Sequence, residues 1–245
     1  MTAPDPFPRL VPLGLDGLLV SFADRLQDRA NRAALAFRAA VEAEGIDGVT
    51  ETASSLVSAF VAFDPGRTDR DALDRKLHEM IDAHDWYAAD LPGGRRCFTI
   101  PACFEGDHAP QLDDAAEQAG LSREEAIAEL CAHPLRAMAL GFAPGQAYFG
   151  ELPEHWNIDR QTGLTPKAEM GAVVVAVRQM IVFATSSPTG WRQVAMTRFH
   201  GFRPDAGDDA IALAPGDEVQ LRAVDADTFA GLTPPEGGAT VEAIA

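Results

Sequence analysis

The sequence predicts an α+β protein in two parts: a small N-terminal α/β domain, followed by a β-barrel or β-sandwich domain. Strand-like and helix-like segments alternate over residues 15–83. The segment DWYAADLPGGRR at 85–96 then interrupts this pattern with Pro-Gly-Gly and indicates a linker. Beyond residue 135, short β-branched runs alternate with Gly, Pro and Asp turns, which is typical of barrels and sandwiches.

The first half of the N-terminal domain is expected to contain a strand and then a helix. LDGLLVSF at 15–22 indicates the strand. Asp24 is the expected N-cap of the helix, and Gly45 is placed where a left-handed C-cap is usual. Apolar residues at helical spacing define the face that the helix would bury, namely Leu26, Ala30, Ala33, Phe37 and Val41.

The second half of this domain repeats the strand and helix pattern. LVSAFVAF at 56–63 indicates a strand, and Thr68 with Asp71 approximates a capping box at the start of the next helix. That helix would bury Leu73, Leu77, Met80 and Ile81. We therefore expect a small sheet with the helices packed on one face.

The barrel domain is expected to begin after residue 90, which gives domains at 1–90 and 91–230. A strand at 97–103 precedes helices at 111–119 and 123–132, and Ser122 with Glu125 forms a capping box for the second helix after Gly120 has stopped the first. Three β-like runs follow, AVVVAV at 172–177, MIVFAT at 180–185 and EVQLRAV at 218–224. Residues 231–245 are poor in core-forming side chains and predict a loosely held tail.

Composition excludes several classes of partner. The 245 residues carry 20 Lys and Arg against 37 Asp and Glu, a formal net charge of -17, which disfavours nucleic acid and anionic membranes. No long apolar run and no signal-peptide pattern is present, so a cytoplasmic location is expected. The odd count of three cysteines, Cys97, Cys103 and Cys131, predicts reduced and buried thiols.

Two polar stretches are weak candidates for metal sites. The histidines of HEMIDAH at 78–84 are six residues apart, whereas a zinc helix needs them four apart. EGDHAPQLDD at 105–114 could hold a divalent cation, but Asp113 and Asp114 also suit the first turn of a helix, which is the interpretation we favour. Neither a P-loop nor a G-x-S-x-G elbow occurs in the sequence. We therefore predict no metal site and no cofactor bound by an evident motif.

Two segments rich in glycine and aromatic residues are the remaining candidates for a ligand site. They are LGFAPGQAYFG at 140–150 and SSPTGW at 186–191. Glycine lets backbones approach closely, and Trp, Tyr and Phe supply flat pocket walls. From the residues alone, the favoured interpretation is that these segments are turns that close a barrel.

These segments carry a family resemblance that extends from about Leu13 to Val224. Leu140–Phe149 is similar to the motif L-G-F-x-P-G-F-x-Y-L, Gly171–Val173 to G-S-V, Ser187–Trp191 to S-P-G-G-W, and Pro215–Asp217 to a last P-G-D turn. The chain thereby resembles the first-subunit half of the biotin-dependent carboxyltransferase domain of urea carboxylase and urea amidolyase. Stand-alone members of that family are the allophanate hydrolase subunit 1, a subunit of the bacterial ATP-dependent 5-oxoprolinase, and the Kip sporulation kinase inhibitor.

The resemblance implies a small N-terminal α/β domain followed by a cyclophilin-like β-barrel. It also implies a homologous second subunit as partner, a small amide or lactam as ligand, and ATP or carboxybiotin handled through the complex. On this basis the turn at 140–150 is expected to line the pocket at the barrel edge. The expected substrate-binding residues are Phe142, Pro144, Gly145, Gln146, Tyr148, Arg160, Gln179, Ser187, Gly190 and Trp191.

The chain departs from the family at several of these positions. Gln146 replaces a phenylalanine, and the second of two family arginines falls at Thr165, which leaves Arg160 as the remaining anion ligand. The Q-T-G-I-Y segment becomes Gln179–Phe183 and loses its tyrosine, while G-R-T becomes Ala195–Thr197 and loses its arginine. Because threonine and methionine cannot replace the bidentate hydrogen bonds of arginine, a carboxylated ligand would be held differently here.

Two hypotheses follow from the sequence. The first is a hydrolase or carboxyltransferase subunit, inactive alone, in which Gln146 and Gln179 bind amide groups and Tyr148 and Trp191 form the walls. The second is a non-catalytic regulatory binding protein similar to the histidine kinase inhibitor. No general acid or base is identified; His108 is a weak candidate, because its segment departs from the family's G-P-D-L at Gln111.

Overall fold

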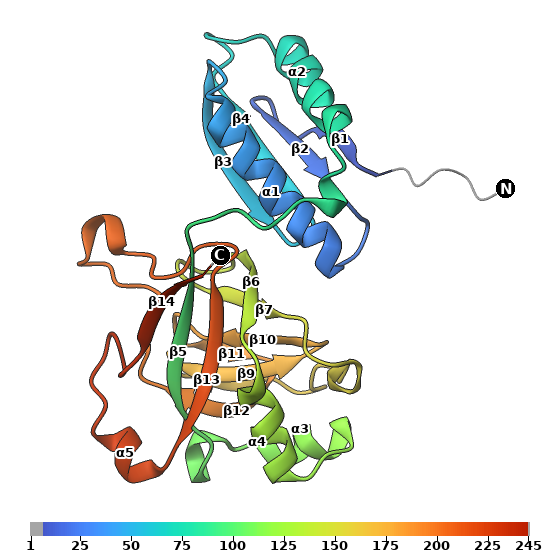
Figure 1. Ribbon diagram of the computed structural model, residues 1–245. Coiled ribbons are helices and arrows are strands. Elements are labelled where there is room, and N and C mark those ends of the chain that lie inside the picture. Colours follow the sequence, from blue (N-terminus) through green and yellow to red (C-terminus); the bar gives the residue numbers. More distant parts are fainter. Residues whose placement is uncertain (1–6, 245) are drawn as a thin grey trace, which may run out of the picture. The chain divides into compact units, whose positions relative to one another are not determined.

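The computed structural model describes residues 7–244, and the chain divides into two compact units, one ending at Gly93 and one beginning at Gly94 (Figure 1). The division falls inside the predicted linker at 85–96. The α+β class is confirmed, with a small α/β unit preceding a β-barrel.

The N-terminal unit is a four-stranded antiparallel sheet with two helices. Its strands lie in the order β1 (Arg9–Pro12), β2 (Gly17–Ser21), β4 (Ser58–Phe63) and β3 (Val49–Ser55). The helices are α1 (Asp28–Glu44) and α2 (Arg70–Ala83), and a short 3-10 turn, η1 (Trp86–Ala88), follows. β1 and β3 were not predicted, because neither sequence shows the apolar run of a buried strand.

Both helices cover the same face of this sheet, as expected. Val20 and Val61 from the strands share one core with Phe37 from α1 and Leu77 from α2. The core also includes Trp86, whose indole N–H donates to the backbone oxygen of Met80 at 3.0 Å. The predicted linker at 85–96 is therefore wrong at its start. Trp86 is held in the core by aromatic contact with Phe37, with ring centroids 5.1 Å apart.

The ends of the helices partly match the sequence prediction. Gly45 ends α1 in the left-handed conformation, with φ of 60°. The predicted N-cap at Asp24 is wrong, because α1 begins at Asp28; Phe22 still donates to the backbone oxygen of Val57 and extends the sheet pairing beyond β2. In α2 the capping side chain is that of Asp69, which accepts from the backbone N–H of Ala72.

The C-terminal unit contains a closed seven-stranded barrel. Its strands follow the order β6 (Leu135–Leu140), β13 (Glu218–Val224), β5 (Arg95–Cys103), β12 (Arg192–Thr197), β9 (Ala172–Ala176), β10 (Gln179–Val182) and β7 (Ala147–Gly150). β7 pairs with β6 and closes the barrel. Within it, β13 and β5 run parallel, whereas the other described pairings are antiparallel.

Helices and short elements complete this unit. α3 (Leu112–Ala119) and α4 (Arg123–Ala132) lie together and contact β12 and β13, respectively (Figure 1). The capping box of Ser122 and Glu125 is confirmed, as is the left-handed Gly120 after α3. The smaller elements are η2 (Gly106–His108), η3 (Glu154–Trp156), η4 (Gly207–Asp209), α5 (Ala226–Ala230), and a two-stranded sheet of β8 (Thr165–Ala168) and β11 (Ser187–Thr189).

Strands β9 and β10 are buried on both faces. Val173 and Val175 belong to the large core of this unit, whereas Val174 packs in a smaller cluster with Ile181 and Trp191. Successive side chains of a strand point to opposite faces, so an uninterrupted apolar run such as AVVVA fits a strand covered on both sides. The smaller cluster forms the floor of the candidate site described below.

The predicted loose tail at 231–245 is wrong over residues 240–244. These residues form β14 (Thr240–Ile244), which pairs antiparallel with β5 from Arg95 to Thr99. β12 pairs with β5 only at Ala102 and Cys103, so the backbone groups at the start of β5 remain available on that side. An unpaired strand edge is a template for another strand, and β14 fills it.

The turn before β13 provides the first testable prediction. Asp217 is 3% exposed and accepts hydrogen bonds from the backbone N–H groups of Arg96 and Ala214, both at 2.9 Å, and from the Arg96 guanidinium at 2.5 Å. Asp217→Ala would leave these donors without their acceptor, so we expect a loss of about 3 kcal/mol in the free energy of unfolding. Urea denaturation tests this, with Asp208→Ala, an exposed aspartate, as a control that should change stability little.

Within residues 7–244, no helix has the length and apolar character needed to cross a membrane.

Candidate functional site

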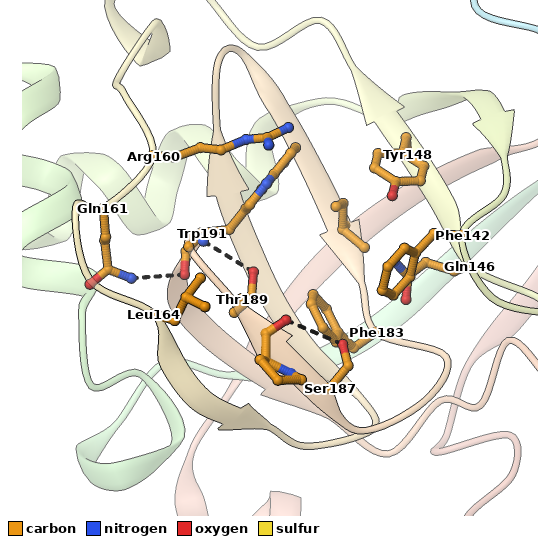
Figure 2. A pocket seen from close by; sticks show the side chains of 13 residues that line it. Phe142, Gln146, Tyr148, Arg160, Gln161, Leu164, Phe183, Ser187, Thr189 and Trp191 are labelled. Carbon is orange, nitrogen blue, oxygen red and sulfur yellow. Dashed lines mark hydrogen bonds between the residues drawn. The ribbon is translucent and has the colours of Figure 1, made fainter.

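A cavity of about 320 Å³ lies in the barrel unit over the smaller apolar cluster (Figure 2). Its walls come from the turn after β6, from β7, from the loop before β8, from β10 and the residue after it, from β11, and from the start of the chain leading into β12. The lining residues are Phe142, Gln146, Tyr148, Arg160, Gln161, Leu164, Ile181, Phe183, Ser187, Pro188, Thr189, Gly190 and Trp191.

The turn between β6 and β7 forms one side of the cavity. Gly141 donates to the backbone oxygen of Gln146 at 3.0 Å, and Gln146 donates to that of Ala143 at 3.1 Å, which closes the turn. Gly145 has φ of 73° and lies against the backbone of Gly201, where a side chain would not fit. The glycine and proline residues thus shape a turn that places Phe142 and Gln146 at the cavity (Figure 2).

Two aromatic rings and one guanidinium form another part of the wall. The rings of Tyr148 and Trp191 meet edge to face, with centroids 6.2 Å apart. The Arg160 guanidinium lies over the Trp191 ring, with its central carbon 5.5 Å from the ring centroid. Such cation–π contact orients an arginine without using its hydrogen-bond donors. The donors of Arg160 therefore stay able to bind an anionic ligand.

A chain of glutamines holds the loop before β8 against β12. The Gln161 amide donates to the backbone oxygen of Trp191 at 3.0 Å and accepts from Gln111 at 3.3 Å. Gln111 in turn accepts from the backbone N–H of Gln193 at 2.6 Å and donates to Thr165 at 3.0 Å. Gln161 lines the cavity, but its amide is occupied in fixing the position of the Trp191 wall.

The charge of the cavity lining comes from a single described residue. Among the described residues that line it, Arg160 is the one that carries a formal charge at neutral pH, and none is Asp, Glu, His or Lys. The remaining lining groups are amides, hydroxyls, aromatic rings and aliphatic side chains. The arrangement suits a small ligand with one negative group, an apolar body and amide-like polar atoms. Among the described lining residues, Tyr148 is of a type that can act as a general acid or base, and the lining holds no His, Asp, Glu, Lys or Cys for that role.

Residues 8–213 match the family described as carboxyltransferase domain, subdomain C and D. The chain belongs to this family. The expected family is therefore confirmed by a match that runs through the N-terminal unit and into the C-terminal unit as far as residue 213.

Individual relatives of this carboxyltransferase-domain chain extend the finding. A protein of Bacillus subtilis (strain 168) that is named as a subunit of 5-oxoprolinase is 26% identical over 223 residues, which cover 85% of this chain and 90% of the relative. A protein of the same name from Escherichia coli O157:H7 is 31% identical over 126 residues, or 51% of this chain and 57% of the relative.

Solved structures show the same fold. The protein TTHA0988 superposes with a TM-score of 0.70 at 27% identity, over 90% of this chain and 41% of that one. The urea amidolyase of Kluyveromyces lactis superposes with a TM-score of 0.68 at 15% identity, over 96% of this chain and 16% of that one, and shows likeness of fold alone. The chain spans less than half the length of either solved protein.

The structure brings together most of the predicted site residues of this carboxyltransferase-domain chain. Seven of them line the cavity: Phe142, Gln146, Tyr148, Arg160, Ser187, Gly190 and Trp191. Their proposed roles in binding substrate stay predictions. Three of them, Pro144, Gly145 and Gln179, do not line it. Gln179 is the first residue of β10, two residues before the lining residue Ile181. It pairs with Gly150 of β7 and Ala176 of β9.

The remaining lining residues were not predicted. Sequence reasoning passed over Gln161, Leu164, Ile181, Phe183, Pro188 and Thr189. Two of these, Gln161 and Leu164, come from the loop before β8, which reaches the cavity because β8 pairs with β11 some twenty residues later in the chain. The family motifs could have pointed to Pro188 and Thr189, which lie inside the S-P-T-G-W segment. Gln161 follows Arg160 directly but carries no motif of its own.

The weaker candidates for chemistry lie outside the cavity. The His108 ring contacts the Phe229 ring in a tilted arrangement, with centroids 4.6 Å apart, and does not line the cavity. Asp113 and Asp114 occupy the first turn of α3, as expected. Over residues 7–244 no group of three or more His, Cys, Asp or Glu side chains is arranged to hold a metal ion. Burial raises the pKa of the Cys97 and Cys103 thiols, which suits inert structural cysteines.

Asp114 connects α3 to β12 through Arg192 and gives a pH prediction. Hydrogen bonds from the Arg192 guanidinium and the Gln118 amide hold the pKa of Asp114 below its ordinary value of 3.8. The folded carboxyl therefore binds its proton more weakly than the unfolded one, so its stabilising effect is present above about pH 4 and is lost as the pH falls through the lowered pKa.

We expect Asp114→Asn to be less stable than the unmodified protein at pH 7, with a difference that shrinks toward pH 2. Urea denaturation at a series of pH values measures this. A difference that stays constant over the series would contradict the assignment of the lowered pKa to this carboxyl.

Proposed function

We propose that this chain is a subunit of an ATP- or biotin-dependent enzyme that processes a small amide or lactam, and that it is active with a homologous second subunit. In this proposal the barrel cavity holds the substrate. The Bacillus subtilis and Escherichia coli relatives are both named as subunits of 5-oxoprolinase, which supports a lactam as the substrate class. Family membership supports the same broad chemistry.

The observation that carries the proposal is the single cation among amides and aromatic walls. A five-membered lactam with one carboxylate presents one negative group, one amide and a small apolar ring. Arg160 fits the carboxylate, Tyr148 and Trp191 fit the ring, and Gln146 fits the amide. A substrate with several negative charges would find no matching set of cations among the described lining residues.

We infer that ATP is not the ligand of this cavity. A triphosphate carries several negative charges and is usually bound with Mg²⁺ through carboxylates and a glycine-rich loop. In the part of the chain that the structure describes, the cavity offers one guanidinium and no carboxylate. We therefore assign the handling of ATP or carboxybiotin to the partner proteins. Apart from the Tyr148 hydroxyl, the described lining offers no usual general acid or base, so we assign the other groups that transfer protons to the second subunit.

Affinity purification of this chain from its native lysate tests the proposal. We expect the homologous second subunit to co-purify, and the recovered assembly to hydrolyse ATP in the presence of 5-oxoproline but not in its absence. A cavity whose described lining offers no His, Asp, Glu or Lys would equally suit a regulatory binding protein. Recovery of a sensor kinase, with no lactam-dependent ATP hydrolysis, would overturn the enzyme proposal and favour that alternative.

A further inference from the structure

Resting on the proposed function, we infer that Gln146 determines the chemical selectivity of the cavity. Its side-chain oxygen accepts a hydrogen bond from the amide N–H of the ligand. The site would then select lactams and unsubstituted amides over ligands of the same shape that lack this N–H. Lactones and N-alkyl lactams belong to the excluded class.

The first support is the burial of an unpaired acceptor. Gln146 is 2% exposed, and no described residue donates a hydrogen bond to its side-chain oxygen. Buried polar atoms in folded proteins are nearly always hydrogen-bonded, so an unpaired one at a cavity calls for an explanation. Gln146 also lines the cavity (Figure 2). Because the oxygen itself is buried, the amide group would turn toward the cavity for a donor carried by the ligand to complete its hydrogen bonding.

The second support is the contrast with Gln161. The amide of Gln161 donates to the backbone oxygen of Trp191 and accepts from Gln111, so the protein itself uses both ends. Both glutamines line the same cavity, and of the two side-chain oxygens that of Gln146 remains unpaired among the described residues. The structure thus assigns a fixing role to Gln161 and a recognition role to Gln146.

The chemistry of the ligand follows from the chemistry of the acceptor. A carbonyl oxygen accepts hydrogen bonds and cannot donate them, so it discriminates in favour of an N–H group. In a lactone the ring oxygen replaces the N–H and sets one acceptor against another, which is unfavourable. Sites built to hydrogen-bond a polar group reject analogues that lack it, because the buried partner is left unpaired.

The stability of a Gln146 variant distinguishes a role in ligand recognition from a structural role. Gln146→Met keeps nearly the same shape and removes a buried acceptor that has no protein partner among the described residues, so stability should stay the same or rise. Gln220→Met is the matched control, because Gln220 donates to the backbone oxygen of Cys131 at 3.1 Å and does not line the cavity. It should lower stability slightly and leave ligand binding unchanged.

The test is calorimetric titration of the chain, and of the complex recovered with it, with two ligands. The ligands are 5-oxoproline and the five-membered lactone that carries the same carboxylate. We expect the unmodified protein to bind the lactam at least about tenfold more tightly than the lactone, and Gln146→Met to lose this preference. Thermal unfolding of both variants supplies the stability comparison.

The outcomes separate this inference from the proposed function. Equal affinity of the unmodified protein for lactam and lactone would overturn the inference while leaving the lactam site in place, and this comparison needs no variant. A preference that persists in Gln146→Met, or a loss of stability in that variant as large as in Gln220→Met, would also overturn it. Binding of neither ligand, to the chain or to the complex, would overturn the proposed function itself.

Discussion

Arg160→Ala should weaken the binding of 5-oxoproline by about 10- to 100-fold, the range expected when a hydrogen-bonded charged partner is lost. Arg160 is the one described lining residue with a formal charge, and the whole chain carries a net charge of -17 that otherwise disfavours an anionic ligand. Its guanidinium is already oriented over Trp191, so little conformational freedom is lost on binding. Calorimetric titration of the variant measures the effect.

Three comparisons sharpen this prediction. 2-Pyrrolidinone, which has the lactam but no carboxylate, should bind the unmodified protein and Arg160→Ala with similar affinity. Arg222→Ala, which removes an exposed arginine of β13 outside the cavity, should leave the binding of 5-oxoproline unchanged. Arg160→Lys keeps the charge but not the planar fork, so it should restore only part of the affinity. Equal loss for both ligands in Arg160→Ala would show that the arginine supports the cavity wall and does not bind the carboxylate.

Gly145→Ala should destabilise the barrel unit by about 3 kcal/mol, the sum of a left-handed backbone and a steric clash. Gly145 has φ of 73°, a conformation that alanine adopts at a cost. Its added Cβ atom would lie 2.5 Å from the carbonyl carbon of Gly201 and 2.8 Å from the backbone nitrogen of Phe202. Both are backbone atoms and cannot move aside as a flexible side chain could.

Gly141→Ala is the matched control in the same turn. No atom of the described residues lies within 4 Å of a Cβ atom placed on Gly141, and its φ is not in the left-handed range. The free energy of unfolding of Gly141→Ala should therefore stay within about 0.5 kcal/mol of that of the unmodified protein. Urea denaturation compares the two variants. Equal stability of the two variants would contradict the close packing of Gly145 on Gly201. The turn at 140–150 is thus held by backbone contact, and its apolar character serves the cavity.

The elements of the fold that could be predicted carry signals in the local sequence. The helices α1 and α2 show apolar periodicity, and Gly45 and Gly120 mark the helix ends that they were expected to mark. The run AVVVAV predicted β9 because β-branched residues favour a strand buried on both faces. Each of these signals depends on neighbours in the sequence, so no knowledge of the tertiary structure was needed.

The parts that were missed depend on distant partners. β3, with the sequence VTETASS, has no apolar run and exists because β4 pairs with it. β14 is exposed along most of its length and is held by the unpaired edge of β5. α1 begins four residues after the predicted cap, since sheet pairing continues through Phe22. Such features follow from tertiary contacts that propensity does not contain.

The candidate site shows the same division. Motif resemblance pointed to Phe142, Tyr148 and Trp191, which do line the cavity. Gln161 was not identifiable, because its importance lies in hydrogen bonds to Trp191 and Gln111, both far away in sequence. Gln179 was expected at the site from its motif, but it is the first residue of β10 and does not line the cavity. Motifs therefore indicated the region of the site, and the register of short strands decided its membership.

The most direct test of the central claim is a crystal structure of the chain, alone or in its complex, with 5-oxoproline bound. The account predicts the lactam in the barrel cavity, with its carboxylate within hydrogen-bonding distance of Arg160, its ring beside Tyr148 and Trp191, and its N–H facing Gln146. A complex that turns over 5-oxoproline while the lactam is bound elsewhere would contradict it.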